Sequence, residues 1–284
     1  MGKAKDIQLR PIPAAQANEL VKRIHYSGKV VQNSQLHIGV FYDGRLEGAM
    51  QFGPSLDKRK IQGLVTGTAW HEFIELNRMA FSEALPRNSE SRAIAVAMRL
   101  LRQHAPQIKW VVSFADGTQC GDGTIYRASG FVLTGIKRND QILVAPPDAQ
   151  DLPKQIFAGS MTMLGPKGAA AQRRQILSRV TITKGQYIAE TGAASVQPFI
   201  DAGYKPLDGF QLRYIYFIDP TYRQRLTVPE LPFSEIARMG ARMYRGQRLQ
   251  ANEAIQDATG DQSEKGGASP TRSLHNDNLH LQGR

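Results

Sequence analysis

The sequence of 284 residues has a single cysteine, Cys120, and no apolar run long enough to cross a membrane. One thiol excludes an intramolecular disulfide and a zinc cluster built on cysteines. A membrane-spanning helix needs roughly 20 apolar residues, and residues 1–16 lack the apolar centre of a signal peptide. We therefore expect a soluble, cytoplasmic protein.

Acidic residues are scarce, since 25 Asp and Glu accompany 36 Lys and Arg and the formal net charge is +11. Residues 246–284 hold four of the basic and five of the acidic residues, so the positive charge lies in residues 1–245. A basic body favours a polyanionic partner because binding releases counterions. Charge alone does not distinguish a binding patch from a solvated basic face. The candidate phosphate contacts are Lys58, Arg59, Lys60, Arg173 and Arg174.

Aromatic residues are absent from residues 246–284, which are rich in Gln, Asn, Asp, Gly and Ser. Such a segment buries too little apolar surface to offset the entropy lost on folding, so we predict a disordered tail. Residues 1–245 are predicted to form one domain, with a core over about residues 10–140 and a C-terminal extension over residues 141–245.

Hydrophobic periodicity predicts strands that alternate with helices. Asp43-Gly44 separates two apolar runs and is a strong hairpin signal. Ile94, Ala97, Met98 and Leu101 form one apolar helical face. The order of elements predicts an α/β domain with a mixed sheet. The predicted strands cover residues 35–42, 46–52, 73–81, 108–114, 131–136 and 212–218, and the predicted helices residues 14–25 and 91–104.

Residues 73–131 resemble the central motifs of the GNAT N-acetyltransferase superfamily, with Tyr126 placed before the Gly130-Phe131 pair. The resemblance implies a mixed, mostly antiparallel sheet flanked by helices, with acetyl-coenzyme A as the donor. It also implies that Tyr126 lies near the acyl thioester and protonates the leaving thiolate. The loop of residues 86–92 departs from that pattern.

Glycine is missing from this loop, whose sequence is PRNSESR. A glycine-rich loop lets backbone N–H groups approach the pyrophosphate of coenzyme A. Here side chains keep a phosphate away from the backbone, and Glu90 would repel it. We therefore expect a donor other than acetyl-coenzyme A.

Three longer stretches, residues 75–78, 88–93 and 113–131, resemble the Mom family of bacteriophage DNA-modification proteins. His25-Tyr26 and residues 213–217 extend the resemblance, which covers roughly residues 10–245. The resemblance implies transfer of a carbamoylmethyl group to the exocyclic amine of adenine in double-stranded DNA. It also implies protection of phage DNA from host restriction enzymes, in the cytoplasm of the infected bacterium.

The carbamoylmethyl substituent is glycinamide joined through its amine, which suggests a route by acyl transfer. A glycyl group placed on the exocyclic amine would carry a free amine that attacks the adenine ring carbon. Collapse of the spiro ring would leave glycinamide on the base, without redox chemistry. The donor would be an activated glycine such as glycyl-tRNA, which suits the missing glycine loop and the basic body. The sequence leaves the participation of iron open.

Three side chains are the main catalytic candidates, each with a plain structural alternative. Arg78 would hold a donor carboxyl or phosphate, or form a salt bridge at a strand end. Asp116 would orient or deprotonate the attacking amine, or form an Asx turn with Gly117. Tyr126 would act as a general acid or an orienting hydroxyl, or pack in the core.

The remaining candidates lie at the start of the long helix and after the first helix. Asn88, Ser89, Ser91 and Arg92 would bind the donor, because a helix N-terminus favours an anion. Ser91 is also a catalytic candidate, with helix capping as the alternative. His25 and Tyr26 would stack on a flipped base, with packing as the alternative. We predict no metal site, because Asp122 and His71 lack a two-His-one-carboxylate spacing.

Two other functions remain open at this point. An ordinary N-acetyltransferase acting on a small amine or a protein would bind coenzyme A tightly. A non-catalytic nucleic-acid-binding protein would bind DNA in a salt-dependent manner and leave adenine unmodified.

Overall fold

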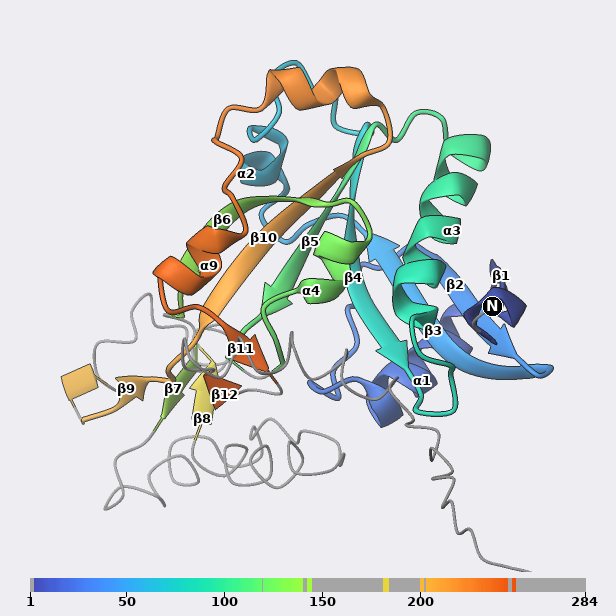
Figure 1. Cartoon of the computed structure of the whole chain (residues 1–284), viewed down its shortest axis with the longest axis horizontal. Coiled ribbons are helices and arrows are strands. Elements are labelled where there is room, and N and C mark those ends of the chain that lie inside the picture. Colours follow the sequence, from blue (N-terminus) through green and yellow to red (C-terminus); the bar gives the residue numbers. More distant parts are fainter. Residues whose placement is uncertain are drawn as a thin grey trace, which may run out of the picture. The chain divides into compact units, whose positions relative to one another are not determined.

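The computed structural model describes residues 3–118, 120–139, 142–144, 181–183, 200–201, 203–244 and 247–248. Its centre is a seven-stranded sheet (Figure 1). Across the sheet, the strands are β1 (Gln8–Pro11), β2 (Leu36–Tyr42), β3 (Arg45–Gly53), β4 (Phe73–Phe81), β5 (Trp110–Asp116), β10 (Phe210–Phe217) and β6 (Val132–Arg138).

Neighbouring strands of this sheet run antiparallel, except for β4 and β5, which run parallel. The prediction of a mixed, mostly antiparallel sheet flanked by helices is therefore confirmed. The position of β10 between β5 and β6 was not predicted, because sequence order does not show that a late strand inserts between two earlier ones.

Helices cover both faces of the sheet. On one face, α3 (Ser89–His104), α4 (Thr124–Ala128) and α9 (Ser234–Arg238) contribute to the main core. On the other face, α1 (Ala14–Ile24) and α2 (Lys58–Gln62) each pack over a smaller cluster. We call these the α3 face and the α1/α2 face.

The long helix begins earlier than predicted. α3 starts at Ser89 rather than Ser91, and its N-cap is Asn88. The predicted apolar positions Ile94, Ala97, Met98 and Leu101 are all buried in the main core. The Asp43-Gly44 hairpin is also confirmed, and both residues have the positive φ that such a turn requires.

Smaller elements complete the described part of the chain. They are β7 (Ile142–Val144), β8 (Thr181–Thr183) and β9 (Lys205–Pro206) in one small sheet, β11 (Met243–Tyr244) and β12 (Gln247–Arg248) in another, and the 3-10 helices η1 (Lys3–Asp6) and η3 (Pro220–Arg225).

Several predictions concern residues that lie outside this description. Arg173 and Arg174 are among them, as are residues 249–284 of the predicted tail. The single domain over residues 1–245 and the disordered tail therefore stay predictions. Among the described residues, no helix is both long and apolar enough to cross a membrane.

Candidate functional site

The site lies where the two parallel strands of the main sheet separate. β4 and β5 pair only from Phe73–Trp110 to Glu75–Val112. Beyond that point β4 stays paired with β3 and β5 with β10, and the two arrows diverge in Figure 1. Side chains from both faces of the sheet can meet in this opening.

A β-bulge in β4 decides which face Arg78 occupies. Ile74 and Leu76 pack into the main core before the bulge, and Met79 and Phe81 pack into it afterwards. The register with β3 shifts between these pairs, so that one extra residue breaks the strict alternation of side chains. Arg78 is thereby turned onto the α1/α2 face.

Tyr26, which follows the C-terminal end of α1, lies near the three main catalytic candidates and near Cys120. Burial raises the pKa of Tyr26 well above its ordinary value, and the charges of Asp116 and Cys120 add to this rise. Arg78 lowers the same pKa and Tyr126 raises it. Each of these four side chains is close enough to Tyr26 to affect it electrostatically, and we call the five residues the Tyr26 cluster.

The hydroxyl of Tyr126 is oriented by Ser113, a fully buried residue of β5. Ser113 Oγ lies 3.1 Å from the carbonyl oxygen of Leu76 and 2.9 Å from Tyr126 Oη. A carbonyl only accepts, so the single serine proton goes to Leu76 and the Tyr126 hydroxyl donates to Ser113. The lone pairs of Tyr126 Oη are then available to a ligand.

The ionisation of Tyr126 is strongly disfavoured. Burial is the main cause and raises the pKa of Tyr126 to about 12, although the ionised oxygen would accept a hydrogen bond from the Ser113 hydroxyl, which lowers the pKa. Tyr126 also packs against the rings of Phe131 and Tyr214, at centroid distances of 5.3 and 5.2 Å. The core packing considered as an alternative is therefore present, together with a hydroxyl that stays protonated near neutral pH.

Asp116 ends β5, and its carboxylate is held by the loop that follows. Oδ1 accepts the backbone N–H of Thr118 at 3.0 Å and also the Thr118 hydroxyl. This is an Asx-type turn, closed by Thr118 rather than Gly117. Such a turn fixes the direction of the carboxylate and remains compatible with a role in binding an amine.

Arg78 is anchored by backbone carbonyls. Its Nε donates to the carbonyl oxygen of Lys29 at 3.2 Å and its Nη1 to that of Asn77 at 2.7 Å. The guanidinium therefore links β4 to the segment that follows Tyr26. Since carbonyls do not neutralise its charge, Arg78 supplies a positive charge to the Tyr26 cluster.

Sequence reasoning overlooked Ser113 and Glu75 as residues of the site. Glu75 is half-buried, and burial raises the pKa of its carboxyl although Ser55, Asn77 and Arg78 act in the opposite direction. Glu75 in turn raises the pKa of Tyr126. The sequence did contain a signal for both residues. Glu75 and Ser113 lie in the stretches 75–78 and 113–131 that resemble the Mom family, and each of these stretches also holds a catalytic candidate.

His25 is packed rather than exposed. The residue is 8% exposed, and its ring lies against that of Tyr26 at a centroid distance of 4.2 Å. The Ser27 backbone N–H donates to Nδ1 at 3.2 Å, so Nδ1 is an acceptor, and the Ser27 hydroxyl lies 2.8 Å from it. Packing was the alternative for His25, and Tyr26 is the residue of this pair that lies beside the catalytic candidates.

The predicted donor-binding residues gather at the start of α3. Asn88 has a left-handed backbone, with φ of 69°. Ser89 is buried, and its hydroxyl has no hydrogen-bond partner among the residues that the structure describes. Ser91 Oγ donates to the Asn88 carbonyl at 3.2 Å, a local contact of the helix start, and Arg92 is exposed. Their role in donor binding stays a prediction.

Asp122 has a structural partner. Its Oδ2 accepts from Arg242 Nε at 2.9 Å and its Oδ1 from the Thr124 hydroxyl at 3.0 Å. His71 is exposed. Among the residues that the structure describes, no three His, Cys, Asp or Glu side chains are arranged to hold a metal ion.

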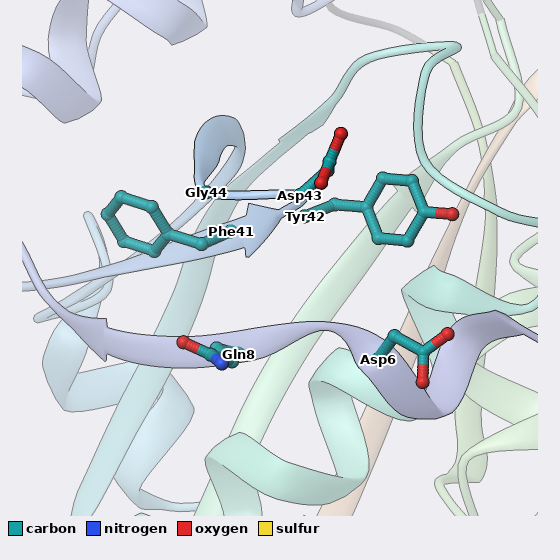
Figure 2. A pocket seen from close by; sticks show the side chains of 6 residues that line it. All are labelled: Asp6, Gln8, Phe41, Tyr42, Asp43 and Gly44. Atoms are coloured by element: carbon teal, nitrogen blue, oxygen red, sulfur yellow. The ribbon is translucent and has the colours of Figure 1, made fainter.

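A surface pocket lies elsewhere, at the β1–β2 edge of the sheet. None of the candidate residues that the structure describes lines it. Figure 2 shows its lining residues, which are Asp6, Gln8, Phe41, Tyr42, Asp43 and Gly44.

Comparisons with known proteins give a family and a partial structural likeness. The model of the Mom protein family matches residues 6–235. The "Methylcarbamoylase mom" of Escherichia phage Mu is 39% identical over 133 residues, which are 46% of this chain and 55% of that relative. The match thus spans about half the length of the curated relative.

Solved N-acetyltransferases are similar over about half of the chain. A Bacillus subtilis acetyltransferase in complex with coenzyme A is 11% identical, with a TM-score of 0.34 over 47% of this chain and 80% of its own. The ribosomal-protein-S18-alanine N-acetyltransferase of Escherichia coli is 13% identical, with a TM-score of 0.34 over 50% of this chain and 86% of its own.

Proposed function

Because the chain belongs to the Mom protein family, we propose that it is a transferase that modifies adenine in double-stranded phage DNA. The observation that carries the proposal is the Tyr26 cluster, which combines an oriented carboxylate, a protonated phenol and an arginine at the β4–β5 opening. The "Methylcarbamoylase mom" of phage Mu supports it by its name. The product we propose is adenine with a carbamoylmethyl group on its exocyclic amine.

The first step is glycyl transfer from an activated ester, for which glycyl-tRNA is the proposed donor. The exocyclic nitrogen attacks the ester carbonyl, a carbon–nitrogen bond forms, and the carbon–oxygen bond to the leaving hydroxyl breaks. The amine loses one proton and the leaving alkoxide gains one, so the step is balanced without an oxidant or reductant.

The second step rearranges the product of the first. The free glycyl amine attacks the ring carbon that bears the exocyclic nitrogen and forms a five-membered spiro ring. The bond between that carbon and the original exocyclic nitrogen then breaks. The attacking amine gives up one proton and the departing nitrogen takes one up, so the original nitrogen becomes the primary amide and glycinamide remains on the base through its amine.

The residues of the cluster divide the work of the first step. Asp116 accepts a hydrogen bond or a proton from the exocyclic amine, which is a poor nucleophile. Tyr126 donates its proton to the leaving oxygen, since its pKa of about 12 keeps the hydroxyl protonated at neutral pH. Arg78 stabilises negative charge that develops on the carbonyl or the leaving group.

DNA is the acceptor in this proposal, and extrusion of the base follows from it. A site built between two strands of a sheet is difficult to bring up to an amine that is stacked and paired in a duplex. The net charge of +11 favours binding of the phosphate backbone. Modified adenine would protect the phage genome because restriction enzymes read the exocyclic amine in the major groove.

The proposal is tested by expressing the protein in bacteria and analysing plasmid nucleosides by mass spectrometry. We expect a deoxyadenosine heavier by one carbamoylmethyl group, absent from cells with an empty vector. Growth on labelled glycine should place the glycine carbons and nitrogen in the substituent. An acetylated deoxyadenosine, or plasmid DNA without a modified adenine, would contradict the proposal. If the exocyclic nitrogen is labelled and its label is missing from the product amide, the rearrangement is wrong.

A further inference from the structure

An aromatic side chain is exposed in the interior of the main sheet, next to the Tyr26 cluster. Trp110, Val112 and Phe114 alternate along β5, so they share the α1/α2 face. Trp110 and Val112 are buried under the cluster that contains Ile61 of α2. Phe114 continues the same row, yet it is 37% exposed. An exposed ring on a central strand calls for an explanation, because such positions are usually covered.

The neighbouring strand leaves the ring of Phe114 accessible. Arg213 of β10 pairs directly with Phe114 in the register. Its guanidinium nevertheless lies over Gly135 of β6, where Nη2 would be 3.2 Å from an added Cβ. Arg213 Nη2 donates to the carbonyl of Thr134 at 2.7 Å and Nε to the Thr134 hydroxyl at 3.0 Å. These bonds direct the side chain away from β5.

Phe114 and Asp116 point to the same face of β5. Asp116 lies two residues further along β5 and therefore on the same face, at a spacing of about 7 Å. Tyr26 lies beside Asp116. The ring of Phe114 therefore offers a flat apolar surface. The carboxylate of Asp116, which can accept a hydrogen bond from an amine, lies roughly the width of a purine away.

We propose that Phe114 is the platform on which the extruded target adenine stacks, with its exocyclic amine directed toward Asp116. The inference rests on the proposed function and adds the residue that receives the base. Stacking on an aromatic ring suits an extruded nucleobase, because it replaces the stacking lost in the duplex. His25 is packed against Tyr26 and therefore exposes much less ring surface on which a base could stack.

The test compares two duplexes that differ only at the target position. One holds adenine opposite an abasic site, and the other holds an abasic site in place of that adenine. The flanking sequence is one found to be modified. The full-length wild-type protein should bind the adenine duplex more tightly, by between about 5- and 150-fold. Phe114→Ala should remove this preference and leave the affinity for the abasic-target duplex unchanged.

Two variants make the result specific. Phe114→Tyr keeps an aromatic face and should retain the preference. Trp70→Ala removes another exposed aromatic side chain, which is 51% exposed and lies just before β4. This variant should also retain the preference for the adenine duplex. The inference is overturned if Phe114→Ala keeps the preference, or if Trp70→Ala loses it equally. Either result leaves the proposed function intact, since that depends on whether plasmid adenine is modified.

Discussion

Tyr126 shows how burial prepares a single residue for acid chemistry. Its pKa of about 12 arises mainly from burial, and its proton is directed to Ser113. To protonate a leaving group, Tyr126 must exchange this bond for one to the substrate. Ser113 would then act as a positioning residue rather than one that touches the reacting atoms.

Tyr126→Phe should reduce the rate of DNA modification by about 10²-fold or more, because it removes the proton donor. Ser113→Ala should reduce it less, by about tenfold, since the phenol remains but loses its orientation. Single-turnover assays on plasmid DNA measure both rates. Equal rates for Tyr126→Phe and the wild type would contradict the assignment of the acid.

The free energy of unfolding should fall as the pH rises from 10 to 12. The pKa of Tyr126 is raised from 10.0 to about 12 in the folded state, so folding favours the neutral phenol. Its contribution is complete below pH 10 and is lost by pH 12, by up to about 2.5 kcal/mol. Denaturant unfolding at several pH values should show that the free energy of unfolding falls less for Tyr126→Phe than for the wild type. An identical fall in both proteins would contradict the burial of the Tyr126 hydroxyl.

Sequence reasoning reached Arg78, Asp116 and Tyr126 but not how they meet. Nothing in the pattern around Asn77 predicts an extra residue in β4, and strict alternation would have placed Arg78 in the main core. Ser113 was overlooked because a serine within a buried apolar run carries no periodic signal. Its importance depends on contacts with Leu76 and Tyr126, which are distant in sequence.

At the scale of secondary-structure elements, the start of α3 depends on the backbone of Asn88. This residue has φ of 69° and, within the described part of the chain, its side chain makes no capping bond. Asn and Gly tolerate a left-handed backbone, whereas other residues are strained by their Cβ. The helix itself was predictable from its apolar face, but its first turn was not, because positive φ at an N-cap leaves no clear sequence signal.

Asn88→Gly should change the free energy of unfolding by less than about 0.5 kcal/mol, while Asn88→Ala should lower it by about 1 kcal/mol. Urea unfolding of the two variants checks this directly. Equal stability of the glycine and alanine variants would show that the backbone conformation does not limit the helix start.

An ion pair between the buried Asp122 and the partly exposed Arg242 joins the loop before α4 to the start of β11. The backbone N–H of Asp122 also donates to the carbonyl of Met243 at 3.2 Å. Arg242→Ala should lower the free energy of unfolding by about 3 kcal/mol, because it leaves a buried carboxylate unpaired. Adding Asp122→Asn should recover part of this loss. Urea unfolding measures the stability of both variants. If the double variant is no more stable than Arg242→Ala alone, the proposed pairing is wrong.

At the scale of the whole molecule, positive charge should govern DNA affinity. Arg59 and Lys60 of α2 are exposed, whereas Lys58 lies over the ring of Trp70 with Nζ 4.5 Å from its centroid. Replacing Arg59 and Lys60 with Ala should reduce the slope of log K against log salt by about 0.9 for each lost phosphate contact. Arg238→Ala is the control, because Arg238 is paired with Glu235. If the slope is unchanged for the double variant, Arg59 and Lys60 do not contact the DNA.

The central claim is that the Tyr26 cluster modifies adenine, and Asp116 offers its most direct test. Plasmid DNA from cells that express Asp116→Asn should contain at least about 10²-fold less modified deoxyadenosine than wild-type plasmid. Trp70→Ala, expressed to the same level, should retain the wild-type amount. Wild-type modification by Asp116→Asn, measured by mass spectrometry of the nucleosides, would contradict the account.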